Sequence, residues 1–306
     1  MRTASIRFDA WSLVWRGLWQ KLAPRCALPD CVHRRSVWRR LRGAGPGIVM
    51  QGVRYCLDDC LERALVTAFP RPHPGPKRAA ASHRVPLGLL LLSRQQLNAD
   101  QLRAALTAQR AAGYGRIGEW LQTLGFVSEQ EITAALACQW ACPVLRADSM
   151  PLDGIDRIPQ IPVALLESAF MVPVAYVEAT ATLYVAFGEG IDYGVLYALQ
   201  QMLLCRSEFC LAAPSLLRRC LQTLPEQREE SEVLFDSVAD VAEFARIVRS
   251  YSARVAASEI RMASCGRYVW VRLLSQASRP LDLLLCRPGE SARHTSLSPA
   301  PLAPAV

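Results

Sequence analysis

The sequence has no long apolar run. The longest aliphatic stretch, Leu87 to Leu92, is interrupted by Gly88 and is far shorter than the roughly 18 residues needed to span a bilayer. The first 25 residues also lack a signal peptide, because Arg16 breaks their apolar stretch and no small-residue cleavage site follows. We therefore expect a cytoplasmic protein without a transmembrane segment.

Lysine is nearly absent as well: the chain has 2 lysines against 33 arginines, and none follows Lys77. No GxxxxGK[ST] loop occurs, so the phosphate cradle of a P-loop ATPase is not expected. Paired carboxylates, a nucleophile elbow and a glycine-rich dinucleotide loop are also not recognisable. The sequence accordingly predicts a protein that is not an enzyme.

Acidic residues are scarce only in the N-terminal part. Residues 1–84 carry a net charge of +11, whereas the remainder carries −3. Arg34, Arg35, Arg39, Arg40 and Arg42 surround Trp38 in this part. Such a mixture suits phosphate contact with stacking, so nucleic-acid binding through residues 34–42 is one interpretation, and a solvated arginine-rich surface is the other.

Cysteine, by contrast, is abundant at 11 residues. An odd count without a secretion signal argues against a disulfide framework. Cys26 and Cys31 form one close pair, and Cys56 and Cys60 form another. Two such pairs can complete a tetrahedral four-cysteine zinc site of structural type; the alternative is four unrelated thiols.

Composition shifts divide the chain into segments. The expected parts are a basic four-cysteine zinc-type module at 1–70, a Pro/Gly/Arg linker at 71–84, a densely apolar domain at 85–224, a charged linker at 225–235, a small α/β unit at 236–287 and a disordered tail at 288–306.

An internal repeat lies in the apolar domain. Residues 85–109 align with 115–139 at an offset of 30, which superposes Gly88 on Gly118 and Gln109 on Gln139. Each copy fits a helix–turn–helix, with Asn98 or Ser128 capping the second helix and Gln101 or Glu131 completing a capping box. The two copies must pack together to bury their aliphatic stripes.

A different pattern follows Pro143. Runs at 171–176, 182–187 and 208–212 indicate strands, and segments at 193–204 and 214–224 indicate helices. The fold class is therefore α+β: a tandem helix–turn–helix repeat followed by a small α/β unit, with the zinc-type module before them and the C-terminal α/β unit after them.

The second repeat copy resembles a known motif. Arg116-Ile117-Gly118, followed by Leu121, Gly125, Phe126-Val127, Ile132, Leu136 and Gln139, is similar to RLGxxLLxxGLLxxxxLxxxLxxQ of the MshEN domain. This is the N-terminal domain of type II secretion and type IV pilus ATPases, the GspE/PilB group. Later segments, including Cys142-Pro143-Val144, Met171-Val172-Pro173-Val174 and Leu183-Tyr184-Val185-Ala186, follow the order of that family.

Some members of this family bind cyclic di-GMP through the two motif copies. The resemblance implies ligand-binding roles for Arg84, Leu87, Gly88, Leu91, Arg116, Ile117, Gly118, Leu121 and Gly125. The first copy departs from the motif: Pro86 stands in place of the arginine, with Arg84 nearby, and Gln95 and Gln96 replace the turn glycine and an aliphatic residue.

The resemblance continues briefly beyond this domain. Ala257 to Met262 is similar to the strand that opens the next ATPase subdomain, and Tyr268 to Arg272 to the strand after it. With no motor motif present, the resemblance implies a regulatory or adaptor protein that docks a secretion or pilus machinery partner and binds cyclic di-GMP, or one that docks a partner alone.

Overall fold

A computed structural model describes residues 26–31, 47–56, 59–71, 84–146, 160–223 and 231–288. Contacts divide the chain into two units. One unit, here called the composite unit, joins the described residues up to Arg71 to Ser231–Met262 and to those from Arg267 onward. The other, here called the central unit, comprises Pro72–Glu230 with Ala263–Gly266. The linker at 71–84 and the tail at 288–306 lie almost entirely outside the described residues.

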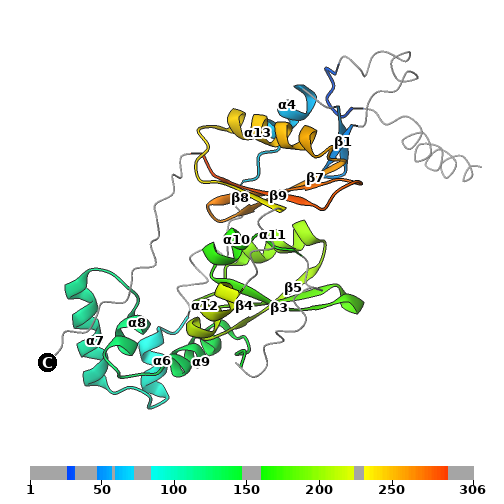
Figure 1. The fold of residues 1–306 in the computed structure, drawn as a ribbon. Coiled ribbons are helices and arrows are strands. Elements are labelled where there is room, and N and C mark those ends of the chain that lie inside the picture. The colour runs from blue at the N-terminus through cyan, green and yellow to red at the C-terminus, as the bar shows by residue number, and fades with distance from the viewer. Residues whose placement is uncertain are drawn as a thin grey trace, which may run out of the picture. The chain divides into compact units, whose positions relative to one another are not determined.

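The described part of the central unit begins with four helices, which Figure 1 shows grouped together. They are α6 (Leu87–Ser93), α7 (Ala99–Ala112), α8 (Ile117–Thr123) and α9 (Glu129–Trp140). Two of them fall in each of the segments aligned as repeat copies, and contacts between α6 and α9 and between α7 and α8 link the two pairs. Leu91 and Leu121, equivalent in the repeat, are fully buried in one shared core.

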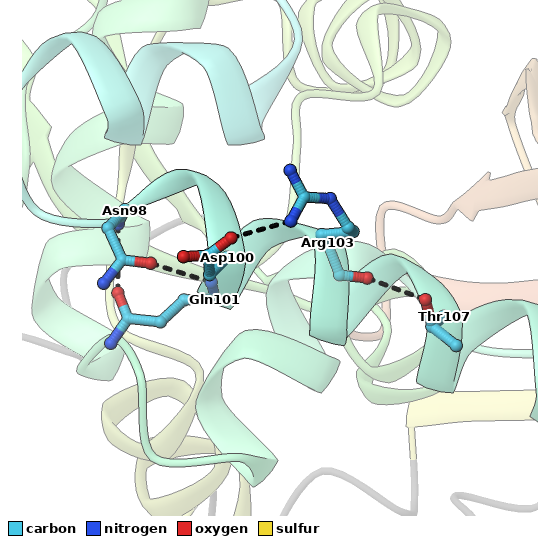
Figure 2. A network of polar contacts seen from close by, with 5 residues as sticks. All are labelled: Asn98, Asp100, Gln101, Arg103 and Thr107. Atoms are coloured by element: carbon cyan, nitrogen blue, oxygen red, sulfur yellow. Dashed lines mark hydrogen bonds and ion pairs between the residues drawn. The ribbon is translucent and has the colours of Figure 1, made fainter.

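Both expected capping boxes are present. Asn98 Oδ1 accepts from the backbone N of Gln101 at 2.8 Å, and Gln101 Oε1 accepts from the backbone N of Asn98 at 3.0 Å (Figure 2). Ser128 and Glu131 repeat this arrangement at the start of α9. Each box satisfies two amides that a helix start leaves without intrahelical partners, which fixes where α7 and α9 begin.

A small α/β part follows within the same unit. Its elements are α10 (Val163–Ser168), β3 (Met171–Val177), the 3₁₀ turn η3 (Glu178–Thr180), β4 (Thr182–Phe187), α11 (Tyr193–Leu203), β5 (Arg206–Leu211) and α12 (Pro214–Thr223). The three strands form a sheet in the order β3-β4-β5, in which β3 and β4 are antiparallel and β4 and β5 parallel. The strands and helices expected after Pro143 are thus confirmed to within a few residues.

The composite unit contains one six-stranded sheet. Its elements are β1 (Ile48–Met50), β2 (Val53–Tyr55), α4 (Asp59–Thr67), β6 (Glu232–Phe235), α13 (Val241–Arg254), β7 (Glu259–Cys265), β8 (Tyr268–Leu274) and β9 (Leu281–Cys286). The strand order is β2-β1-β7-β8-β9-β6. Helices α4 and α13 lie side by side on this sheet (Figure 1) and share its hydrophobic core.

The six-stranded sheet contains strands from both the N-terminal and the C-terminal part of the chain. The sequence segments 1–70 and 236–287 were expected as separate modules, but β1 pairs in parallel with β7, through Val49 with Glu259 and Met50 with Ile260. Likewise, Glu232–Phe235 falls in the expected linker at 225–235 and forms β6, which pairs in parallel with β9. Each of the short strands β1 and β6 gains its stability from a distant partner, which local sequence patterns do not encode.

Candidate functional site

A cavity of about 640 Å³ opens in the central unit. Residues before α6 and α8, at the end of α9, and between β4 and α11 line it, among them Arg84, Arg116, Gln139, Trp140, Glu189 and Tyr193. Its size falls within the range of small-molecule sites. Arg84 and Arg116, the basic residues that precede the first helix of each repeat copy, therefore meet at one cavity.

Arg84 is held over an aromatic ring. Its Cζ lies 3.4 Å from the centroid of the ring of Trp140, the last residue of α9. The neighbouring carbonyl of Val85 accepts from Gln139 Nε2 at 2.6 Å, which ties the chain beside Arg84 to the end of α9. Gly190 leaves room for the indole, since a Cβ at that position would lie 3.1 Å from Trp140 Cζ2. The result is a stacked guanidinium and indole at the cavity wall.

Arg116 has a carboxylate partner. It precedes α8, where its backbone N donates to Glu119 Oε2 at 3.0 Å. Its Nη1 lies 2.6 Å from Glu189 Oε2, and the two side chains are 66% and 42% exposed. An ion pair this exposed contributes at most about 1 kcal/mol. Arg116 can consequently exchange Glu189 for an anionic ligand at little cost.

A second carboxylate at the cavity, that of Asp192, already accepts hydrogen bonds from the backbone. Asp192 Oδ1 accepts from the backbone N of Gly194 at 2.8 Å and of Val195 at 3.1 Å, and thereby caps α11. Capping fixes the loop that also carries Glu189 and places Tyr193 6.1 Å from the Trp140 ring, centroid to centroid.

Gly88 and Gly118 serve helix packing. A Cβ on Gly88 would lie 2.7 Å from Leu102 Cδ1, and one on Gly118 would lie 3.3 Å from Leu87 Cδ2. Both glycines are buried within short helices of the repeat. In this structure they allow one helix to approach another.

The remaining motif residues lie in the repeat core or at a turn. Leu91 and Leu121 are fully buried in this core, and Leu87 and Ile117 are packed against it while partly exposed. Gly125 has φ 69° in the turn between α8 and α9. Of the nine positions assigned from the resemblance, Arg84 and Arg116 are the two that line the cavity.

Sequence reasoning did not select Trp140, Glu189 or Tyr193. Trp140 directly follows the repeat glutamine Gln139, but the first copy has Arg110 at the equivalent position, so the repeat gives no signal for an aromatic residue there. Glu189 and Tyr193 belong to the α/β part, and only the folded chain brings them to the repeat.

Four cysteines of the composite unit are brought together. The Sγ atoms of Cys26, Cys31, Cys56 and Cys60 all lie within 4.8 Å of one another. Cys31 Sγ and Cys56 Sγ are 3.7 Å apart, and Cys26 and Cys31 are buried. The grouping expected from the sequence is therefore present in the fold, and it offers four sulfur ligands of the kind that zinc prefers.

Crowding within this cluster disfavours free thiolates. Burial, followed by hydrogen bonding to Cys31, raises the pKa of Cys60 to about 12. The same causes raise the pKa of Cys56 well above its usual range. Without a cation, Cys56 and Cys60 are accordingly neutral thiols near pH 7.

The arginine-rich segment at 34–42 lies outside the described residues, so nucleic-acid binding through it stays a prediction. Among the helices of the described ranges, none combines the length and apolar character that crossing a membrane requires.

Some solved structures are similar to part of this chain. No protein-family model and no curated protein matches the chain. A solved structure of MshE with cyclic di-GMP aligns at 29% identity over 45% of this chain and 98% of its own, with a TM-score of 0.39. Two structures of the N-terminal domain of XpsE align at 18% and 19% identity, over 47% and 43% of this chain and 94% and 89% of theirs, with TM-scores of 0.35 and 0.28. All three TM-scores lie below 0.5.

Proposed function

We propose that this chain is a non-enzymatic regulatory or adaptor protein related to type II secretion and type IV pilus machinery, and that its cavity binds cyclic di-GMP. The observation that carries the proposal is the meeting of Arg84 and Arg116, which precede the first helix of each copy of an MshEN-like repeat, at one cavity of about 640 Å³.

The chemistry of the ligand matches the residues present. Cyclic di-GMP carries two phosphodiester anions and two planar guanines. The exposed guanidinium of Arg116 can leave Glu189 for a phosphate or a guanine edge. The indole of Trp140, stacked with Arg84, provides a plane on which a guanine can lie.

A regulatory output follows from the position of the cavity. Its walls come both from the helical repeat and from the α/β part of the central unit, so a ligand between them changes how strongly the two parts hold one another. A protein partner that contacts both parts would bind the liganded and free forms with different affinities. This coupling gives the domain its adaptor role.

The test is calorimetric titration of cyclic di-GMP into the full chain and two variants. We expect binding by the wild type and at least a tenfold loss in Arg116→Ala, which corresponds to about 1.4 kcal/mol. The matched control is Arg103→Ala. Arg103 is likewise an exposed arginine of the repeat, and its Nη1 lies 2.7 Å from Asp100 Oδ1. It is not among the residues that line the cavity. Absence of binding by a folded wild-type chain, or equal loss in both variants, contradicts the proposal.

A further inference from the structure

The spacing of the four cysteine sulfurs matches a metal site. A tetrahedral zinc ion with Zn–S bonds of about 2.3 Å requires its sulfurs to be about 3.8 Å apart. Cys31 Sγ and Cys56 Sγ lie 3.7 Å apart, and the whole group fits within 4.8 Å. A disulfide needs about 2.05 Å between sulfurs, so this arrangement corresponds to thiols around a common centre.

The elements that carry these cysteines hold the sulfurs at one point. Cys56 directly follows β2, and Cys60 is the second residue of α4. The segment Cys26–Cys31 lies against the same hairpin, where the backbone N of Ala27 donates to the carbonyl of Arg54 at 2.9 Å. Residues from three places in the sequence thus meet at the sulfur cluster.

Other interactions hold the segment Cys26–Cys31 and the pairing of β1 with β2 only weakly. Strands β1 and β2 have three residues each, and a hairpin of that size is at best marginal in water. Within 26–31 the buried side chains are those of Cys26 and Cys31 themselves. The ion pair between Arg63 and Asp30 is 3.7 Å long and exposed, so it contributes little.

The rest of the hairpin and α4 belong to the composite core. Ile48, Met50, Leu61 and Leu65 are fully buried beside residues of β7, β8 and β9. A bond between Cys26–Cys31 and the start of α4 would therefore attach the N-terminal segment to a sheet built mainly by the C-terminal part of the chain.

We propose that Cys26, Cys31, Cys56 and Cys60 bind one zinc ion as a closed structural site, which ties the N-terminal segment to the composite sheet. Four thiols lose their protons as four Zn–S bonds form, and the resulting centre carries a net charge of −2. No position is left for water, so the ion has no catalytic role.

Metal analysis of the purified full chain, produced without a polyhistidine tag, tests the site. We expect one zinc per chain in the wild type and less than a tenth of that in Cys26→Ser and Cys60→Ser. The matched control is Cys138→Ser, which replaces an exposed cysteine of the central unit and should retain one zinc. Full zinc content in both cluster variants overturns the proposal, as does a metal-free wild type whose mass shows two disulfides.

A second measurement avoids variants that fail to fold. Cobalt exchanged into the wild type should give the thiolate charge-transfer and tetrahedral d–d absorption of a four-sulfur site. Chelation should then raise hydrogen exchange in 48–55 and 59–67 while 163–223 keep their protection. Cobalt absorption typical of octahedral oxygen ligands, or unchanged exchange after metal removal, contradicts the proposed role.

Discussion

Gln139 Nε2 donates to the carbonyl of Val85 at 2.6 Å, and its repeat equivalent Gln109 donates to the carbonyl of Gly115 at 2.8 Å. Because Val85 and Gly115 are also equivalent, each copy uses its last glutamine to hold the chain before the first helix of the other copy. These two reciprocal hydrogen bonds help to hold Arg84 and Arg116, which adjoin Val85 and Gly115, at the common cavity.

We predict that Gln139→Ala and Gln109→Ala each lower the free energy of unfolding of the repeat by about 1 kcal/mol, the value of one lost hydrogen bond. Gln139→Ala should also weaken cyclic di-GMP binding, because the chain beside Arg84 is released. Denaturant unfolding and calorimetry measure the two effects. The control is Gln122→Ala, a change at an exposed position of α8, which should alter neither the free energy of unfolding nor cyclic di-GMP binding. An effect as large as that of Gln139→Ala would contradict the importance of the two glutamine–carbonyl hydrogen bonds.

In the first repeat copy, the turn residue Gln95 adopts a left-handed backbone conformation that is unfavourable for a residue with a Cβ. Gln95 has φ 58°, where the equivalent Gly125 has φ 69°. The left-handed conformation costs a residue with a Cβ about 1–2 kcal/mol, and part of this is offset because glycine loses more entropy on folding. We expect Gln95→Gly to raise the free energy of unfolding by about 0.5 to 1 kcal/mol and Gly125→Ala to lower it. A destabilised Gln95→Gly protein in thermal or denaturant unfolding would contradict this reading.

The next residue carries a polar atom without a partner. Gln96 Oε1 is buried and accepts no hydrogen bond within the described structure, whereas the equivalent Phe126 packs against the repeat core. A buried unsatisfied oxygen costs about 1–3 kcal/mol. Gln96→Leu should therefore stabilise the domain by about 1 kcal/mol in denaturant unfolding. A loss of stability would mean that Gln96 makes an interaction that an aliphatic side chain cannot replace.

The capping box of α9 gives a pH-dependent prediction. Hydrogen bonds from the Ser128 side chain and backbone lower the pKa of Glu131 below its ordinary value of 4.5. The lowered pKa means that this contribution to stability is present above pH 4.5 and is lost as the pH falls through the folded-state value. Ser128→Ala should cost about 1 kcal/mol at pH 7, and the difference from wild type should shrink below pH 4.5. A difference that stays constant down to pH 2 would assign the effect to the cap hydroxyl alone.

Local features of the fold were predictable from the sequence, and long-range ones were not. Asn98 with Gln101 and Ser128 with Glu131 satisfy amides within one helical turn, so their spacing alone indicates where α7 and α9 begin. The pairing of β1 with β7 depends on contacts between opposite ends of the chain. Three-residue strands carry too little pattern to identify such a partner.

The two candidate sites differ likewise in how much of each was predictable from local sequence. Cys26, Cys31, Cys56 and Cys60 were recognisable because ligand spacing is a local signal, and the structure groups them. Of the residues that line the cavity, the family resemblance had singled out Arg84 and Arg116. Leu91 and Leu121 follow the motif because they fill the core of the repeat, and a motif read from sequence does not separate residues that contact a ligand from residues that support the fold.

Hydrogen exchange of the full chain with and without cyclic di-GMP reports both whether the ligand binds and which residues it contacts. We predict slower exchange in four separate segments that meet at the cavity, around residues 84–87, 116–119, 137–140 and 189–195, with no change in the composite unit at 267–274. Protection confined to one repeat copy, or no protection at a ligand concentration that saturates the calorimetric signal, would contradict a single site shared by Arg84 and Arg116.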